Sequence, residues 1–424
     1  MTADERTTIG SDGRIVSVDA LRGLVIFTMI YVNDLAGAPS EIVPAWMRHY
    51  SGPNGMTFVD LVFPSFLFIV GMSIPLALGS RLGRGEPVWK CFGHVVVRAL
   101  SLLFVGVMMV NGSPDAEAMG WSGVLWRTLM FVAAILAFSS LGRGRKAERS
   151  ADRERILRRV TVVLRVLGLA SLVLLALAFR GEDGQRIVRL RPFSVHTEWY
   201  GILGLIGWAY LVAAIVFLVF RGRRTALLGC VVLLLCLYPA DRTGAFEGFW
   251  LSRVVGIGGT LGALGSIAAA GVLLGSVLRA PEITSTGGRA RFALLFVAGC
   301  AVGAWLLNGL YGINKNNTAP SWCLWTCAIT GGLWLLFHLL VDIRPHGLLA
   351  KLCRPLATAG SNVLLAYLIS EMLPSARGLL GLDGWYYRLA APGLAYAMAR
   401  SIGCALAILA VTAGLNRVGF RLRL

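Results

Sequence analysis

Three polar residues near the start of the chain have side chains that are suited to general acid–base chemistry. Asn33 lies at the end of the first apolar stretch, His49 follows in a polar loop, and Asp60 opens the next apolar stretch. A histidine can act as a general base near neutral pH, a carboxylate can fix its tautomer, and an amide can stabilise a developing oxyanion. However, a loop histidine is more often an exposed bystander, and an aspartate at a span entrance often only caps a helix. Spacing alone favours this structural interpretation.

Several charged or polar side chains lie in or near other apolar stretches. There, an unpaired charge costs about 2–3 kcal/mol on insertion scales, so each should pair with a neighbour or line a polar cavity. Arginine guanidinium groups could also bind phosphates bidentately, although structural pairing explains them equally well. A packing role is favoured for the histidine of this set. The residues are Arg98, Arg127, His338, Asn362 and Glu371.

A polar loop at 309–322 combines amides, a lysine and aromatic rings, including Asn314 and Lys315. Such a mixture suits sugar hydroxyls and ring faces. An ordinary interfacial loop would look similar, because aromatic residues anchor spans at the membrane surface and asparagine forms turns. Asn54 lies in another turn, Gly52–Gly55, between His49 and Asp60.

The elements that would position these residues are membrane helices. Of the 424 residues 56% are hydrophobic and only 15% are charged, and the mean hydropathy is +0.71, which is too apolar for a soluble domain. We therefore predict an all-α, polytopic membrane helix bundle of about 11–12 transmembrane helices, each span needing about 20 residues. The shortest predicted span is 225–240. The predicted spans are 15–35, 57–79, 92–111, 122–141, 160–179, 199–220, 225–240, 257–279, 291–309, 322–341, 355–373 and 391–416.

The distribution of cations predicts the topology. Basic connections such as 143–159 alternate with cation-poor ones such as 112–121, and cations are retained on the cytoplasmic side. Both termini are therefore predicted to be cytoplasmic: a tail at 1–14, a transmembrane domain at 15–416 and a basic tail at 417–424. The net charge of +18 is explained by this topology and by contact with anionic membrane lipids, so we predict no nucleic-acid partner.

The eight cysteines predict neither a disulfide nor a metal site. They form no CxxC pair, and most lie inside apolar stretches, where cysteine behaves as a small hydrophobe. Glycine-rich faces such as that of 254–275 would allow close helix packing and would permit a homodimer.

Two segments, RIVSVDALRGLVIFTMIYVND (14–34) and NGMTFVDLVFPSFLFIVGMSIPLAL (54–78), resemble the transmembrane acyltransferases typified by heparan-alpha-glucosaminide N-acetyltransferase and its bacterial relatives. Segments 123–138, 312–332 and 356–373 extend the resemblance over most of the chain. The resemblance implies a bacterial inner-membrane enzyme that moves an acetyl group from cytoplasmic acetyl-CoA to an amino sugar on the extracytoplasmic side.

The resemblance also implies roles for particular residues. The family's histidine, asparagine and carboxylate map to His49, Asn33 and Asp60, although the loop after His49 is one residue longer and lacks the family's tryptophan. His49 would deprotonate the acceptor or carry the acetyl group transiently, and Asn33 would hydrogen-bond the thioester oxygen. The CoA phosphates would meet Arg22, Arg98 or Arg127. The acceptor would contact Asn54, Asn314, Lys315 and Glu371.

Two rival classes remain open at this stage. A multispanning transporter or flippase of a sugar or lipid-linked substrate would also need many spans, glycine-rich helices and buried charges, although we find no second copy of the VDxLRG or VDLVFP pattern. A catalytically silent relative that scaffolds an envelope assembly ranks last. The altered spacing after His49 is its only support.

Overall fold

A computed structural model describes residues 15–110, 114–142, 151–190, 193–195, 197, 199–280, 282–283, 285–343 and 347–424. The predicted tail 1–14 and part of the basic run 143–159 lie outside the described residues. The chain divides into two compact units, each treated by itself below. The first unit comprises residues up to 25, 44–100 and 205–357, and the second comprises 26–43, 101–204 and 358–424.

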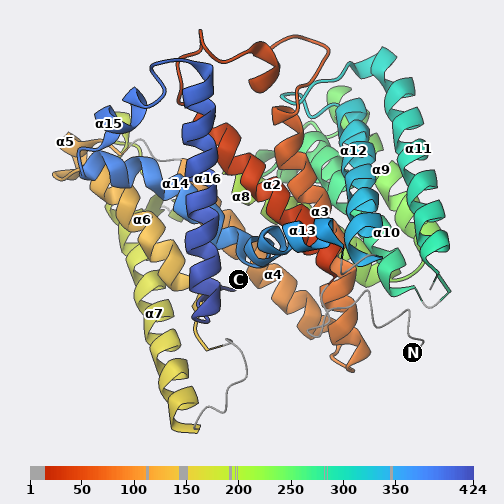
Figure 1. The fold of residues 1–424 in the computed structure, drawn as a ribbon, viewed down its shortest axis with the longest axis horizontal. Coiled ribbons are helices and arrows are strands. Elements are labelled where there is room, and N and C mark those ends of the chain that lie inside the picture. The colour runs from red at the N-terminus through yellow and green to blue at the C-terminus, as the bar shows by residue number, and fades with distance from the viewer. Residues whose placement is uncertain are drawn as a thin grey trace. The chain divides into compact units, whose positions relative to one another are not determined.

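Eleven helical stretches in the described residues are long and apolar enough to cross a membrane, which confirms the predicted polytopic all-α membrane protein (Figure 1). They are Val16–Leu35, Val59–Gly83, Val88–Val110, Asp152–Ala178, Gly201–Phe220, Arg224–Arg242, Ile257–Arg279, Thr286–Tyr311, Pro320–Asp342, Pro355–Leu379 and Leu394–Arg417.

The shortest apolar helix differs from the predicted one. The stretch expected to be shortest, 225–240, is a 19-residue helix, whereas the stretch predicted at 122–141 is a helix of only 15 residues, α6 (Gly123–Ala137). The physical reason lies at the end of α6. Phe138 ends the helix, and Ser139–Ser140 forms strand β1, which pairs antiparallel with β4 (Arg421–Leu422). The backbone groups that would extend the helix are therefore used in a strand pair.

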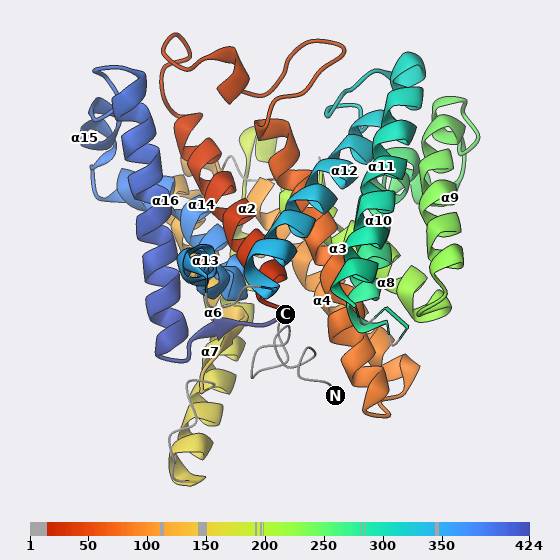
Figure 2. The same ribbon diagram turned by 45° about the vertical axis from the view of Figure 1, so that its right-hand side comes forward.

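The first unit contains most of the helices that surround the buried helix α10. Its elements are the first part of α2 (Val16–Leu35), η1 (Ala45–Met47), α3 (Val59–Gly83), most of α4 (Val88–Val110) and α8 (Gly201–Phe220), α9 (Arg224–Arg242), η3 (Trp250–Arg253), the π-helix η4 (Ile257–Leu264), α10 (Gly265–Ser276), η5 (Val277–Arg279), α11 (Thr286–Tyr311), α12 (Pro320–Phe337), the π-helix η6 (His338–Asp342) and most of α13 (Leu348–Ala359). Helix α11 packs along α12, as Figure 2 shows.

Helix α10 is the core of the first unit because its side chains are small. All twelve of its residues are buried, and it packs along α3, the helix that begins next to Asp60. A Cβ added at Gly271 would overlap the backbone carbonyl of Phe68, and one at Gly71 would overlap that of Ala268. Glycine at both positions thus allows the two backbones to approach closely.

Replacing Gly271 by leucine is expected to destabilise the first unit by about 1–3 kcal/mol, because the added side chain meets backbone that cannot rotate away. Thermal unfolding of the purified protein in detergent measures this. Gly299→Leu on α11 is the matched control, since a Cβ at Gly299 would meet open space. Equal effects of the two substitutions would contradict the close-packing interpretation.

The described residues of the second unit form helices and two short antiparallel strand pairs. Its elements are the end of α2, the end of α4, α5 (Ala116–Met119), α6, β1, α7 (Ala151–Ala178), η2 (Glu182–Gly184), β2 (Val188–Leu190), β3 (Phe193–Val195), the first residues of α8, the end of α13, η7 (Gly360–Asn362), α14 (Val363–Leu379), α15 (Asp383–Arg388), α16 (Leu394–Arg417) and β4. Strand β2 pairs with β3 as Val188↔Val195 and Leu190↔Phe193.

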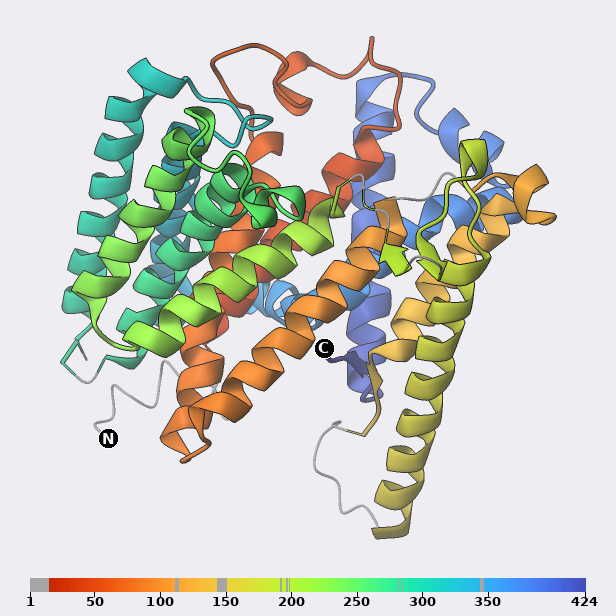
Figure 3. The same ribbon diagram turned by 180° about the vertical axis from the view of Figure 1, so that it is seen from behind.

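Helices α6 and α7 lie side by side in the second unit (Figure 3). The fully buried Trp126 on α6 donates its indole N–H to the carbonyl of Leu175 on α7 at 3.0 Å. Its ring also contacts Phe179 at a centroid distance of 5.1 Å. This satisfied tryptophan fixes α6 against α7, and α14 packs on the same helix.

Candidate active site

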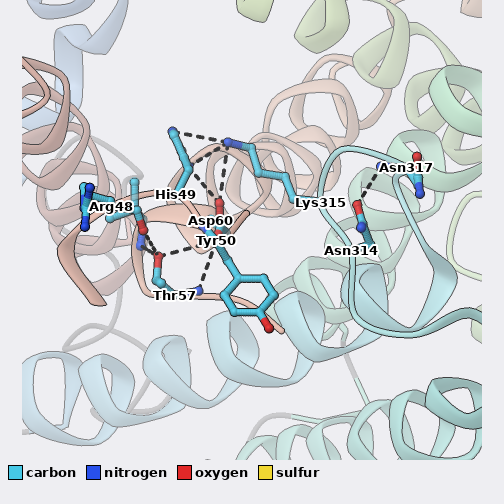
Figure 4. Close-up of polar contacts among 9 residues, drawn as sticks. Arg48, His49, Tyr50, Thr57, Asp60, Asn314, Lys315 and Asn317 are labelled. Atoms are coloured by element: carbon cyan, nitrogen blue, oxygen red, sulfur yellow. Dashed lines mark hydrogen bonds and ion pairs between the residues drawn. The ribbon is translucent and has the colours of Figure 1, made fainter. Parts of the chain in front are cut away.

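The loop histidine and the helix-entrance aspartate are in direct contact. His49 Nδ1 lies 2.7 Å from Asp60 Oδ1 (Figure 4). The carboxylate is 1% exposed, whereas the imidazole is 59% exposed. The buried Asp60 carboxylate thus holds the His49 imidazole, which remains accessible to a reactant. The two predicted residues form one pair.

Local backbone geometry explains why Asp60 is held so firmly. Its second oxygen, Oδ2, accepts the backbone N–H groups of Tyr50 and Thr57, each at 3.0 Å. Both N–H groups belong to the loop that precedes α3, so the carboxylate ties this loop to the first turn of the helix. The Thr57 hydroxyl donates to the Arg48 carbonyl at 2.7 Å, which draws the loop back over the helix start.

These contacts select one imidazole tautomer. Because Oδ2 accepts two backbone N–H groups, the Asp60 carboxylate acts as an acceptor only, and the short Nδ1–Oδ1 contact then requires a proton on His49 Nδ1. In the neutral form of this imidazole, His49 Nε2 carries the lone pair. A neutral histidine held in this way can accept a proton at Nε2.

A third group, Lys315, lies next to this pair although it is 266 residues away from His49 in sequence. Its Nζ atom is 2.9 Å from His49 Nδ1, 3.3 Å from His49 Nε2 and 3.7 Å from Asp60 Oδ1. Nζ is thus nearer to Nδ1, which donates to Asp60, than to Nε2, and it lies beside the imidazole ring. Lys315 was predicted to contact the acceptor, and its contact with His49 and Asp60 adds a role that its sequence position did not suggest.

A pairing of two loops brings Lys315 to His49. Gly55 N–H donates to the Ile313 carbonyl at 2.8 Å, and Ile313 N–H donates to Asn54 Oδ1 at 2.8 Å. Asn314 Oδ1 accepts the Asn317 N–H at 3.0 Å and so closes the turn that contains Lys315. Asn54 and Asn314 thus use their amides to shape the loops. Their predicted contact with an acceptor stays a prediction.

Burial lowers the pKa of Lys315 below the ordinary lysine value, and the nearby Asp60 carboxylate opposes part of that shift. The physical cause is the loss of water around an ammonium group whose side chain is only 29% exposed. The neutral amine is therefore populated at lower pH than for a lysine in water.

The predicted asparagine belongs to the second unit. Asn33 Nδ2 donates to Glu371 Oε1 at 3.2 Å, so α14 orients the amide at the end of α2. Arg127 on α6 attracts the same carboxylate electrostatically. An amide nitrogen carries two hydrogens. The contact with Glu371 uses one and leaves the second for another acceptor.

The adjacent Asp34 is the centre of a network that the sequence analysis missed. Its Oδ1 accepts the Tyr386 hydroxyl at 2.7 Å, and its Oδ2 accepts the Ser401 hydroxyl at 2.7 Å and Arg400 Nε at 3.2 Å. The Arg377 guanidinium lies 3.9 Å from the Tyr386 ring centroid. No local signal in the sequence links Asp34 to residues more than 350 positions away. The available sequence signal is the presence of an aspartate at the end of an apolar stretch, where a charge needs a partner.

The two arginines of the first unit that were predicted to meet CoA phosphates are held differently. Arg22 donates to Asp19 Oδ1 and to the Ser73 hydroxyl, each at 2.7 Å. Arg98 is exposed and lies over the Tyr210 ring, 5.0 Å from its centroid. Stacking uses the face of a guanidinium group and leaves its N–H edges for a phosphate. On this ground Arg98 is the better suited of the two to bind an anion.

The other intramembrane polar residues confirm the expectation of pairing. Asn362 donates to Asn416 Oδ1 at 2.9 Å. His338 Nδ1 lies 2.7 Å from Asp342 Oδ2 in a buried pair. Asp342 also accepts the Ser17 backbone N–H at 3.0 Å, which ties η6 to the start of α2. In the described part of the chain no three histidine, cysteine or acidic residues gather as a metal site, and the expectation of no metal stays a prediction.

Comparison with known proteins shows which sequences this chain is similar to. Residues 14–183 match the family model described as a domain of unknown function (DUF5009). The chain is similar to heparan-alpha-glucosaminide N-acetyltransferase. It is 37% identical to the Mus musculus protein over 139 residues, which is 31% of this chain and 20% of the relative. It is 35% identical to the Homo sapiens protein over 130 residues, 29% and 19% of the two chains. The matched region spans about a fifth of these relatives.

Proposed function

We propose that this protein is a transmembrane acetyltransferase that moves an acetyl group from acetyl-CoA to the amine of a glucosamine-like sugar. The observation that carries the proposal is the His49–Asp60 pair, an exposed imidazole oriented by a buried carboxylate. The similarity to heparan-alpha-glucosaminide N-acetyltransferases supports the reaction class.

In the proposed mechanism the amine nitrogen of the sugar attacks the thioester carbonyl, and His49 Nε2 accepts the proton that this nitrogen loses. Asp60 keeps the other ring nitrogen protonated and stabilises the imidazolium that forms. The carbon–sulfur bond breaks and CoA leaves as the thiolate, which takes up a proton to become the thiol. An alternative route, in which Nε2 carries the acetyl group transiently, uses the same lone pair.

Other residues keep the roles that the resemblance assigns. Asn33 would donate the N–H not used by Glu371 to the thioester oxygen as negative charge develops. Arg22, Arg98 and Arg127 are proposed to meet the CoA phosphates. The bacterial inner membrane, cytoplasmic termini, the acceptor on the extracytoplasmic side, lipid contact and a homodimer remain predictions.

Release of free CoA thiol from acetyl-CoA by purified protein in detergent, with and without glucosamine, tests the proposal. We expect release that rises with glucosamine and is lost in His49→Ala and Asn33→Ala. Glu247→Gln, an exposed loop substitution, should behave as wild type. Folded protein that neither binds acetyl-CoA nor releases thiol would contradict the proposal and favour the transporter.

A further inference from the structure

We propose that Lys315 is itself an acceptor, and that the protein acetylates the Lys315 amine when no sugar acceptor is present. This inference rests on the proposed acetyltransferase function. It adds a covalent modification site on the chain. The geometric basis is the contact of Nζ with the imidazole of the proposed general base, 2.9 Å from His49 Nδ1 and 3.3 Å from His49 Nε2.

Lys315 has the chemistry of the proposed substrate. The amine of glucosamine and the ε-amine of lysine are both primary amines, and both are nucleophilic only when neutral. An acceptor amine must lie about 3 Å from the lone pair of the general base. Nζ lies beside the imidazole ring, 3.3 Å from Nε2, so a rotation of the flexible lysine side chain brings a primary amine to the Nε2 lone pair (Figure 4).

Three features of Lys315 make it more reactive than a surface lysine. The turn closed by Asn314 holds its backbone, so the amine stays near His49. Burial lowers its pKa, which increases the neutral fraction at a given pH, while Asp60 opposes that shift. The side chain is still 29% exposed, so a thioester is not excluded by burial. Among the described residues, His49 and Asp60 are the titratable groups in contact with it.

The step is balanced without a further reactant. The neutral Nζ attacks the carbonyl carbon of the acetyl thioester, a carbon–nitrogen bond forms and the carbon–sulfur bond breaks. The amine proton goes to His49 Nε2, and the CoA thiolate takes a proton to leave as thiol. If Nε2 first carries the acetyl group, the amine displaces the imidazole and the product is the same. Acetylation removes the positive charge beside Asp60.

Mass spectrometry of the full-length protein in detergent, incubated with isotope-labelled acetyl-CoA and no sugar, tests the inference. Chymotrypsin cuts after Tyr311 and Trp322 and so releases Lys315 on the peptide 312–322. We expect that peptide to gain one acetyl group, faster at higher pH, and to gain less when glucosamine competes. Lys90, which is exposed, is the internal control for uncatalysed acetylation.

Two variants test whether the acetylation depends on His49 and occurs on Lys315. His49→Ala should lower acetylation of Lys315 by about 100-fold or more, because it removes the general base. Lys315→Arg should abolish label in the peptide and retain the positive charge. Thiol release by wild type without label on Lys315, or equal labelling of Lys90 and Lys315, would overturn the inference and leave the proposed function standing. Absence of both thiol release and labelling would overturn both.

Discussion

Replacing Asp60 by asparagine is expected to slow acetyl transfer by about 10²–10⁴-fold, close to the loss expected for His49→Ala. The carboxylate accepts hydrogen bonds from His49 Nδ1–H and from the backbone N–H groups of Tyr50 and Thr57. An asparagine amide must present its NH₂ group to one side, where it meets a donor instead of an acceptor. Either the loop loses its anchor, or His49 changes tautomer and offers Nε2–H in place of a lone pair.

Steady-state thiol release at saturating acetyl-CoA and glucosamine measures this prediction. The loss should appear mainly in kcat, because Asp60 is 1% exposed and acts through His49. Glu247→Gln makes the same change of carboxylate to amide on an exposed loop and should leave the rate unchanged. A wild-type kcat in folded Asp60→Asn protein would show that the pair has no part in proton transfer.

Replacing Asp34 by alanine is expected to destabilise the second unit by about 3–5 kcal/mol, because it leaves a buried cation without its partner. The side chain of Arg400 is 2% exposed and that of Asp34 is 10% exposed. Within the described residues Arg400 NH1 already lacks a hydrogen-bond partner. Loss of Asp34 would also remove the acceptor of the Tyr386 and Ser401 hydroxyls.

Thermal unfolding in detergent measures the effect of Asp34→Ala, and Asp152→Ala supplies the matched control. Asp152 pairs with Arg155 at 3.5 Å in the same unit, but its side chain is 80% exposed and that of Arg155 is 73% exposed. Its removal should therefore cost at most about 1 kcal/mol. If both variants unfold at the same temperature, the Asp34 network does not stabilise the unit. Asp34→Asn, which keeps one acceptor oxygen, should fall between the two.

Most of the helical architecture could be predicted from the sequence because it depends on local composition. An apolar stretch of about 20 residues forms a helix in a membrane whatever surrounds it, since every backbone group must bond within the segment. The stretches at 15–35, 57–79 and 391–416, for example, correspond to the helices Val16–Leu35, Val59–Gly83 and Leu394–Arg417. The predicted length of α6 was wrong because the residues after this helix pair with β4, which lies about 280 residues later in the chain.

The candidate site was predictable only where its parts are close in sequence. His49 and Asp60 are eleven residues apart, and their types together with the VDLVFP motif indicated a pair. The Asp34 network and the contact of Asn33 with Glu371 join residues more than 330 positions apart. No local pattern encodes such a pairing, because it depends on which helices pack together.

The sequence by itself determined that this is a polytopic helical membrane protein. It also placed a histidine and an aspartate, residue types that can take part in proton transfer, eleven positions apart. Only the tertiary structure decided that Lys315 lies against His49 and that Asn54 shapes the loop facing it. The physical reason is that hydrophobicity acts through the membrane on each segment separately, whereas a hydrogen bond needs two groups within about 3 Å. That distance is set by the pairing of the loops at 52–55 and 312–317, which brings together parts of the chain about 260 residues apart.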